Sequence, residues 1–230
     1  MAAKEQKLKH VAIICDGNRR WARAHKLEAV LGHRKAVDEV FEPLIDTAIE
    51  QGIEFLTFWV FSTENWKRDG QEVSALLALF RELLTRQIEQ LHKKGIKLQI
   101  IGDLSKFDQD IQEKVKRGLE LTEENKKITV VFALNYGGRD ELVRAANKIL
   151  QAGKSEVTAE EFEGYLDTAG TPDPDLIIRT GGEQRLSGFL PWQSVYAELV
   201  FPEFYFPEFT PKKFEALLAE FRHRNRRFGK

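Results

Sequence analysis

The amino-acid sequence predicts an α/β fold in which helices flank a mostly parallel six-stranded sheet. Two observations lead to this fold class. Short apolar runs alternate along the chain with longer amphipathic stretches. The short runs are almost continuously apolar, which is typical of parallel strands that are buried on both faces. Because no internal repeat, low-complexity segment or long linker interrupts this alternation, residues 1–230 are expected to form a single domain.

Six short runs are predicted to be strands, because they are apolar and bounded by turn-forming residues. They are Val11–Ile14, Glu54–Phe61, Lys97–Ile101, Ile128–Leu134, Asp175–Arg179 and Ala197–Phe201. Six longer stretches are predicted to be helices, namely Gly32–Gln51, Gln71–Lys94, Ser105–Glu124, Arg139–Gln151, Thr158–Asp167 and Pro211–Arg226. In the second of these, apolar residues recur at helical spacing and Gly95 ends the pattern.

The overall composition excludes several function classes. Lys and Arg total 35 against 36 Asp and Glu, so the bulk charge gives no reason to expect nucleic acid as the main partner. The single cysteine, Cys15, excludes an intrachain disulfide framework and a cysteine-rich metal site, which favours a reducing cytoplasm. No apolar run resembles a signal peptide or approaches the roughly 18 residues that span a bilayer. Any membrane contact is therefore expected to be peripheral.

Polar clusters follow four of the predicted strands. They are Asp16–Arg20 after the first strand, Ser62–Arg68 after the second, Asn135–Gly138 after the fourth and Arg179–Ser187 after the fifth. The carboxyl ends of parallel strands lie at one edge of a sheet, which is where ligands bind in such folds. Segments that are distant in the sequence are therefore expected to meet at one site.

The residue types in these clusters favour a pyrophosphate site with magnesium. Arginine presents a planar fork of donors that matches phosphate oxygens. Asp16 would repel phosphate, so it is expected to hold Mg²⁺, which bridges carboxylates and phosphates. Neither GxxxxGK[ST] nor GxGxxG occurs, so the two common nucleotide-binding motifs are absent. Five glycines would let backbone amides approach an anion: Gly17, Gly137, Gly138, Gly181 and Gly182.

Each of these features has a simpler explanation when it is taken alone. The tripeptide Asp16-Gly17-Asn18 is a common turn sequence, and a single arginine is more often found in a surface ion pair. His33 would serve equally well as a helix cap, and tryptophans are more often core residues than ligand contacts. The equivalent positions of the four clusters favour a shared site over these explanations.

Five sequence blocks stand in order along the chain. They read HVAIICDGNRRWA, GHRKAV, FSTENWKR, NYGGRDEL and DLIIRTGGEQRLSGFLPWQSVYAEL. In sequence and spacing they resemble the five blocks of the cis-prenyltransferases, the undecaprenyl pyrophosphate synthase-like isoprenyl transferases. The resemblance runs from His10 to the terminal RRFGK.

This resemblance implies a homodimeric, Mg²⁺-dependent enzyme that condenses isopentenyl diphosphate with an allylic diphosphate of the farnesyl or geranyl type. The product would be a Z-polyprenyl diphosphate, and the growing chain would lie in a hydrophobic tunnel. The apolar stripe of Gln71–Lys94 is a candidate wall of that tunnel, although most of the stripe is expected to be ordinary core.

The resemblance also implies roles for individual residues. Asp16 and Asn65 would be catalytic, and Asp16 and Glu198 would hold the metal. Because a neutral amide is a poor base, a diphosphate oxygen is expected to take the proton. The allylic diphosphate would bind to Gly17, Asn18, Arg19, Arg20, Trp21, His33, Ser62, Thr63, Glu64, Trp66 and Arg68. Isopentenyl diphosphate would bind to Arg179, Arg185, Leu186, Ser187, Arg227 and Gly229, of which the last two would act across the dimer.

Three positions depart from the pattern of the family. Arg19 replaces a glycine, Gln184 replaces a histidine, and Glu28-Ala29 stand where an arginine is common. Arg19 would supply the cation that is missing at Glu28-Ala29. These departures leave head-to-middle condensation of two allylic diphosphates open as an alternative.

Product length is predicted from three bulky residues along the expected tunnel. Val60 stands where long-chain members have an alanine, and Phe132 and Leu134 add bulk on a neighbouring strand, which favours a short to medium product. The sequence also bears on two other functions. A non-catalytic partner subunit is disfavoured because the catalytic acid and the clamp arginines are present. RNA binding through the basic run Arg222–Arg227 is disfavoured by the net charge of −1.

Overall fold

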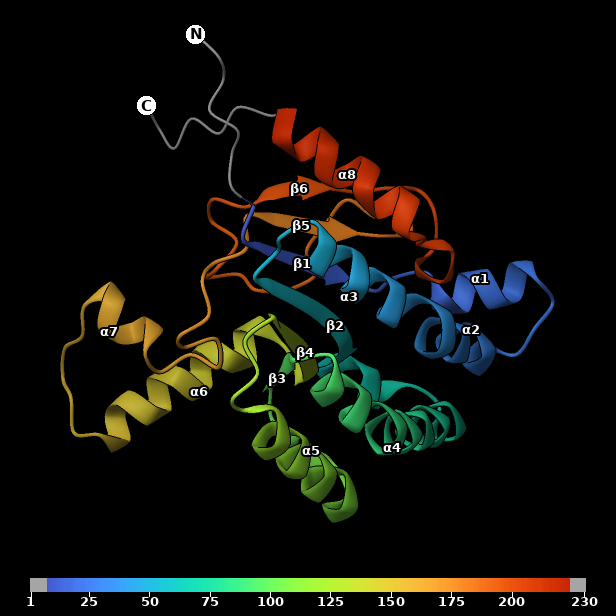
Figure 1. Cartoon of the computed structure of the whole chain (residues 1–230). Helices are drawn as coiled ribbons and strands as arrows, with labels where there is room; N and C mark the ends of the chain where they lie inside the picture. The colour runs from blue at the N-terminus through green and yellow to red at the C-terminus, as the bar shows by residue number, and fades with distance from the viewer. Residues whose placement is uncertain (1–7, 224–230) are drawn as a thin grey trace, which may run out of the picture.

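Six parallel strands form one sheet at the centre of the computed structural model, which describes residues 8–223 (Figure 1). The strands are β1 His10–Ile14, β2 Phe55–Ser62, β3 Ile96–Ile101, β4 Ile128–Tyr136, β5 Leu176–Arg179 and β6 Glu198–Val200. Their order across the sheet is β3-β4-β2-β1-β5-β6, and each neighbouring pair is parallel. The predicted α/β fold with a six-stranded sheet is therefore confirmed.

Helices cover both faces of this sheet (Figure 1). The α-helices of the described residues are α1 Asn18–Ala24, α2 Ala29–Lys35, α3 Phe41–Glu50, α4 Gly70–Lys93, α5 Gln109–Thr122, α6 Gly138–Gln151, α7 Ala159–Glu163 and α8 Pro211–His223. A π-helical turn, η1 Ala36–Val40, joins α2 to α3, and short 3₁₀ turns are η2 Thr63–Lys67, η3 Leu104–Lys106 and η4 Phe206–Glu208. Across residues 8–223 no helix is long and apolar enough to cross a membrane.

Several helices differ from the prediction. The predicted helix Ser105–Glu124 begins only at Gln109, because residues 104–106 form the separate turn η3. The α1 helix was not predicted, because its seven residues are too few and too polar to show an apolar period. The predicted helix Gly32–Gln51 is instead a helical run from Ala29 to Glu50 that η1 interrupts. The predicted helix Thr158–Asp167 shortens to α7, where Thr158 and Glu161 form a capping box at its start. The last residues of the predicted helix Pro211–Arg226 lie outside the described residues.

Alternate strand residues pack into separate cores on the two faces of the sheet. On one face Val11 and Ile13 of β1 belong to a cluster that α3 and α8 complete with residues such as Leu44 and Phe214. On the opposite face Ala12 and Ile14 pack in a second cluster with residues of β4 and of the segment after β5. Both faces of β1 are buried, so its carboxyl end is held rigidly where the polar residues begin.

Two bulges change the direction of side chains at the ends of β2 and β4. Between Trp59 and Phe61 the β2 strand advances two residues while β4 advances one, so Val60 is the extra residue. Between Phe61 and Ser62 the β4 strand carries the extra residue, Asn135, which has a positive φ of 47°. Bulges of this kind re-aim side chains near functional sites. As a result Val60 and Phe61, although adjacent, both contact the cluster under α4.

A glycine is required where β3 ends, because the backbone there passes very close to β4. Gly102 has a φ of 109°, and a Cβ atom at this position would lie 2.0 Å from the Leu134 carbonyl oxygen.

We expect Gly102→Ala to lower the free energy of unfolding by about 3 kcal/mol or more, because backbone strain and a steric clash add to each other. Gly52→Ala is the matched control, because Gly52 also has a positive φ but no atom within 4 Å of the added Cβ. The control should lose only about 1–2 kcal/mol. Urea unfolding measures both, and equal losses would contradict the close approach.

Candidate active site

A cavity of about 490 Å³ lies at the carboxyl ends of β1, β2 and β5. It is lined by Ile14, Cys15, Asp16, Gly17, Asn18, Arg19, Arg20, Arg23, His33, Trp59, Val60, Ser62, Asn65, Arg68, Arg179 and Ser187. Five of these residues are arginines, and Asp16 is the only acid among them. A cavity with this charge favours anions that carry several negative charges.

Most of the predicted site residues meet in this cavity. Those that line it are Asp16, Gly17, Asn18, Arg19, Arg20, His33, Ser62, Asn65, Arg68, Arg179 and Ser187. Those that do not are Trp21, Thr63, Glu64, Trp66, Arg185, Leu186 and Glu198. Arg227 and Gly229 lie outside the described residues. The carboxyl ends of β1, β2 and β5 thus converge at the cavity, whereas the residues at the end of β4 lie outside its lining.

Asp16 and Arg179 form an ion pair across the ends of β1 and β5. One carboxylate oxygen of Asp16 accepts from Arg179 Nη2 at 2.9 Å and from Nε at 3.2 Å. The other accepts from the Gly17 amide at 2.6 Å. Arg179 Nη1 also donates to the Arg185 carbonyl oxygen and to Ser187 Oγ. Arg179 is only 6% exposed, so this set of acceptors fixes a buried cation in one orientation.

Arg20 is held between two acids and an aromatic ring. Its guanidinium lies 3.3 Å from the Asp16 carboxylate and 3.5 Å from Glu183, and it donates to the Gly181 carbonyl oxygen at 2.9 Å. Its central carbon lies 5.3 Å from the centre of the Tyr205 ring, which is cation–π geometry. The same ring packs on Gly17, where an added Cβ would lie 2.6 Å from a ring carbon.

A second pair of cations lies on the opposite side of the cavity. Arg68 donates to the Glu72 carboxylate at 2.8 Å, and Arg19 lies 3.5 Å from the same carboxylate. Glu72 is in the first turn of α4, so this acid ties two arginines to the start of that helix. Arg19, which departs from the family pattern, therefore joins Arg68 in one cationic cluster.

His33 and Asn18 present unpaired polar atoms to the cavity wall. Among the described residues, His33 Nε2 and Asn18 Oδ1 are buried without a hydrogen-bond partner. Burial, together with the nearby charges of Arg68 and Arg19, lowers the pKa of His33 to about 4. The imidazole is therefore neutral at physiological pH. An unpaired buried polar atom is costly unless a ligand or water satisfies it, which favours a polar ligand beside His33.

The η2 turn is held in place by Asn65, Trp66 and Asn135. Asn65 Oδ1 accepts from the Ser62 amide at 3.0 Å, which closes the turn. Trp66 Nε1 donates to Asn135 Oδ1 at 2.8 Å, and Asn135 Nδ2 donates to the Asp103 carbonyl oxygen at 2.7 Å. The positive φ of Asn135 directs its side chain to both partners. Trp66 and Asn135 thus support the cavity from outside its lining.

The predicted role of four glycines in binding an anion through their amides is not supported. The amides of Gly138, Gly181 and Gly182 donate to the carbonyl oxygens of Gly188, Phe204 and Pro202, so they are already used. Gly137 instead allows Thr63 to pack, since an added Cβ would lie 2.6 Å from Thr63 Oγ1. Close packing explains Gly137, Gly138 and Gly181, and a positive φ of 76° explains Gly182. Of the five predicted glycines only Gly17 lines the cavity.

Several predicted site residues have other surroundings. Trp21 is buried and stacks on His25 with ring centres 4.3 Å apart. Glu64 is exposed, and Leu186 packs against the core on the second face of the sheet. Arg185 points outward and pairs with Glu183, which it shares with Arg20.

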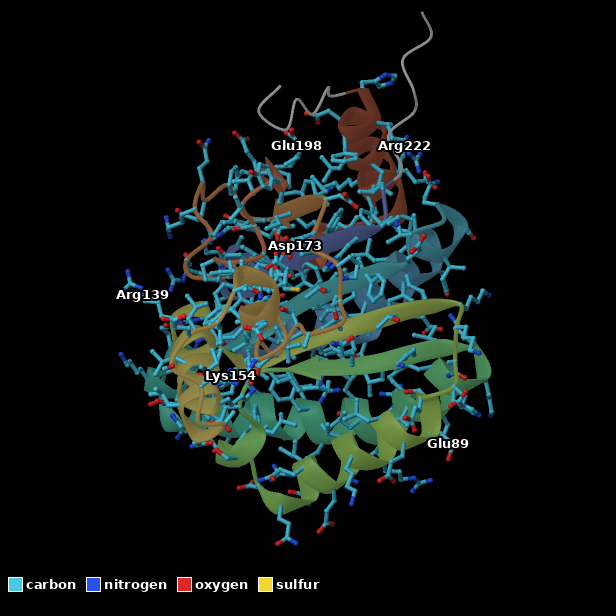
Figure 2. All side chains as sticks on the ribbon, turned by 90° about the vertical axis from the view of Figure 1, so that its left-hand side faces the viewer. Glu89, Arg139, Lys154, Asp173, Glu198 and Arg222 are labelled. Carbon is cyan, nitrogen blue, oxygen red and sulfur yellow. The ribbon has the colours of Figure 1, made fainter. Side chains whose placement is uncertain are left out.

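Glu198 does not meet Asp16 within one chain. It is the first residue of β6 and stands opposite Leu176, the first residue of β5, whereas Asp16 lies beside Arg179 at the other end of β5. The β5 strand places these two ends about 10 Å apart along its axis. In Figure 2 Glu198 is labelled beside β6. Across residues 8–223 no group of three or more His, Cys, Asp or Glu could hold a metal ion.

The sequence agrees with this geometry when it is compared with known proteins. A family model described as putative undecaprenyl diphosphate synthase matches residues 14–229. The chain belongs to this family of prenyltransferases. The isoprenyl transferase of Rhizobium meliloti is 46% identical over 226 residues, which cover 96% of this chain and 91% of that relative. The farnesyl-diphosphate-specific ditrans,polycis-undecaprenyl-diphosphate synthase of Haemophilus influenzae is 43% identical, with 96% and 95% covered.

Two solved structures share the fold of this prenyltransferase. Lavandulyl diphosphate synthase from Lavandula x intermedia, in complex with dimethylallyl diphosphate, superposes with a TM-score of 0.92 at 33% identity, and 97% and 98% of the two chains are covered. A probable undecaprenyl diphosphate synthase from Campylobacter jejuni superposes with a TM-score of 0.84 at 35% identity, with 98% and 100% covered. The chain is therefore an enzyme of the prenyl-transferring class.

Sequence reasoning missed several residues of this prenyltransferase site. Arg23 lines the cavity from the last turn of α1, which was itself not predicted. Glu72 and Glu183 orient the arginines, and Tyr205 packs on two site residues from a distant aromatic segment. The spacing of Arg19 and Arg23 by four residues was the available signal for Arg23. For Tyr205 the sequence holds no signal, because an aromatic run near the carboxyl terminus predicts core.

Tyr205 is expected to hold Arg20 in its binding orientation. Replacing the ring by Tyr205→Leu should weaken binding of inorganic pyrophosphate about two- to fivefold, because an exposed cation–π contact contributes ~0.5–1 kcal/mol. Tyr205→Phe keeps the ring and serves as the control, with expected affinity near that of the wild type. Calorimetric titration gives both dissociation constants. Equal weakening in the two variants would assign the effect to the hydroxyl and contradict the role of the ring.

Proposed function

We propose that this chain condenses isopentenyl diphosphate with an allylic diphosphate of the farnesyl or geranyl type. The product is a Z-polyprenyl diphosphate of short to medium length. The observation that supports this most is the cavity with five arginines and one aspartate, which adjoins an apolar cavity under α4. A polar end for diphosphates and an apolar end for a hydrocarbon chain are what such substrates need.

The apolar cavity has a volume of about 60 Å³ and lies between α3, α4 and the strands β2, β3 and β4. A third cavity of about 20 Å³ lies beside it and shares Cys15, Asn18 and His33 with the polar cavity. Val60, the bulged residue of β2, lines all three. We therefore propose that the hydrophobic tunnel begins at the polar cavity, passes Val60 and continues along the carboxyl-terminal part of α4.

The two diphosphates would bind on opposite sides of Asp16. Arg19, Arg20, Arg68 and the neutral His33 would bind the allylic diphosphate, together with backbone groups of the Asp16–Asn18 turn. On the β5 side, Arg179 and Ser187 would bind isopentenyl diphosphate, with Arg185 near the rim. Two diphosphates repel each other, so clamps of fixed orientation lower the cost of bringing the reacting carbons together.

In the reaction the allylic carbon–oxygen bond breaks and a carbon–carbon bond forms to the terminal alkene carbon of isopentenyl diphosphate. The arginines stabilise the negative charge that develops on the leaving diphosphate. A proton is then lost from the isopentenyl unit. Asn65 holds the Ser62 amide and cannot act as a base, so a diphosphate oxygen takes this proton.

Asp16 fits the role of a metal ligand. Mg²⁺ in proteins is commonly held by one or two carboxylates together with substrate phosphates. Asp16 is the only acid of the cavity lining in the described residues, and its side chain is 29% exposed. Bound Mg²⁺ would neutralise charge on the diphosphates, and Asp16 would hold it next to them. Glu198 would contribute only if another copy of the chain brought it to the site.

A homodimer is supported by exposed apolar side chains on one helix. Val143 and Leu150, seven residues apart on α6, are 60% and 69% exposed, and Val195 is 68% exposed. Contacts by Arg227 and Gly229 across such a dimer stay a prediction. We expect a cytoplasmic enzyme, because the sequence has a single cysteine and so no disulfide framework, with peripheral membrane contact when the lipid product leaves.

A product assay tests the proposed function directly. Labelled isopentenyl diphosphate is supplied with dimethylallyl, geranyl or farnesyl diphosphate, and products are separated by chain length. Elongation of geranyl or farnesyl diphosphate is expected. A product formed from dimethylallyl diphosphate alone, without label, would indicate head-to-middle condensation. The absence of any product would favour the role of a partner subunit.

Two single substitutions test the binding of isopentenyl diphosphate and the role of the metal ligand separately. Arg179→Ala should lower kcat/KM for isopentenyl diphosphate by roughly 10–150-fold, since a lost charge-assisted contact costs ~1.5–3 kcal/mol. Asp16→Ala should abolish turnover while circular dichroism shows a folded protein. Lys116→Ala, on the exposed face of α5, is the control and should be fully active. Normal turnover of Asp16→Ala would refute the metal role.

Val60 should limit product length because its side chain stands between the polar and apolar cavities. Val60→Ala is expected to shift the products toward longer chains by removing two methyl groups from that passage. Val130→Ala, on the same face of the sheet but outside the cavity linings, is the control for general loosening of the core. Chromatography of the dephosphorylated products measures both, and an unchanged distribution in Val60→Ala would remove this residue from the argument.

A further inference from the structure

Ion pairs join two helical segments along the outer side of the apolar cavity. On the segment from α2 to α3 the charged residues Arg34, Asp38, Glu42 and Asp46 recur every four residues, and on α4 the polar residues Glu82, Arg86, Gln90 and Lys94 do the same. A spacing of four places each set on one face of its helix. We call this double row the charged seam.

The two rows pair across the gap between the helices. Arg34 lies 3.1 Å from Glu82, and Arg86 lies 3.8 Å from Asp38. At the far end Lys94 Nζ lies 2.7 Å from Glu42 and donates to both oxygens of Asp46 at 2.8 Å. Partial burial opposes the charge of Lys94, but the hydrogen bonds to Asp46 and Glu42 together outweigh it and raise the pKa of Lys94. Lys94 is thus the most strongly paired member of the charged seam.

The charged seam covers the apolar cavity on its solvent side. Glu42, Gln90 and Lys94 are among the residues that line the cavity. The same helices supply its apolar wall, through residues such as Ile45 of α3 and Ile88 of α4. From Phe80 to Lys94 the wall on α4 extends about 21 Å at 1.5 Å per residue. Lys94 therefore stands at the end of the wall that is farthest from Val60.

The cavity is too small for a prenyl chain while the charged seam is closed. Its volume is about 60 Å³. An apolar cavity of about 150 Å³ holds only a molecule such as benzene. A chain of several isoprene units can therefore enter only if α3 and α4 separate. Such a separation must stretch the ion pairs of the charged seam, because they join the segment from α2 to α3 with α4.

We propose that the charged seam is the gate of the apolar cavity, and that Lys94 with Glu42 and Asp46 sets the chain length at which elongation stops. This inference rests on the proposed function, since it concerns the chain that the enzyme builds. Exposed ion pairs are individually weak, so a growing prenyl chain can separate their partners. The pairs near Arg34 and Arg86 open first, and the doubly paired Lys94 resists longest.

Reversing one charge and then restoring the pairs tests this role. Lys94→Glu puts three acids together, so the charged seam should open more easily. The share of products longer than the main wild-type product should rise about two- to fivefold. The triple variant Glu42→Lys, Asp46→Lys, Lys94→Glu restores opposite charges and should return the wild-type distribution. A distribution that is unchanged in Lys94→Glu, or not restored in the triple variant, overturns the proposal.

Arg81→Glu is the matched control on the same helix. Arg81 pairs with Asp108 and Asp110 and so joins α4 to α5, and it does not line the apolar cavity. Its side chain is 35% exposed, close to the 33% of Lys94. It should keep the wild-type product distribution. A shift as large as that of Lys94→Glu would mean that any loosening of α4 lengthens the product, which contradicts a specific gate.

Hydrogen exchange gives a second measurement that does not depend on activity. Amides of α4 near Ile88 should exchange about two- to fivefold faster in Lys94→Glu than in the wild type, and the triple variant should restore the wild-type rate. If the wild type yields no prenyl product but exchange responds as expected, the proposed function fails and the gate stands. If products form but neither their length nor the exchange responds, the gate fails and the proposed function stands.

Discussion

The ion pair between Asp16 and Arg179 is the constraint on which the rest of the site depends. Arg179 ends β5 directly beside Ile14, the last residue of β1, so its buried guanidinium must find acceptors there. An unpaired buried charge is strongly destabilising. The acceptors come from Asp16, from the Arg185 carbonyl oxygen and from Ser187, which ties the turn after β1 to the loop after β5. One buried cation therefore fixes both walls of the polar cavity.

The two bulges extend this order to the other side of the cavity. An unbroken pleat would direct Val60 and Phe61 to opposite faces, and it would do the same to Leu134 and Asn135. The extra residue in β2 lets Val60 reach the junction of the three cavities while Phe61 stays in the core. The extra residue in β4 then places Asn135 under Trp66. The second bulge offsets the first, so β2 and β4 still end at the same edge of the sheet.

Much of the fold followed from local patterns, because buried parallel strands and long amphipathic helices leave clear periods in a sequence. The site was predictable as far as its residues belong to strand ends, as Asp16 and Arg179 do. Tyr205 and Glu72 escaped prediction because their contacts depend on how distant segments pack. Glu198 was expected near Asp16 by resemblance, yet it begins its strand where Asp16 follows the end of one, and only the register of β5 with β6 reveals this. The bulge at Val60 likewise has no mark in the sequence.

Ion pairs have opposite roles in the polar cavity and along the charged seam. The Arg179 guanidinium is desolvated and multiply bonded, so any displacement leaves this buried charge without a partner, and the site stays rigid. Along the charged seam the side chains remain partly in water, which replaces any contact that breaks, so opening costs little. A catalyst that handles charged groups at one end and a growing chain at the other needs both properties. The difference in solvent exposure between two sets of similar ion pairs supplies them within one sheet and its covering helices.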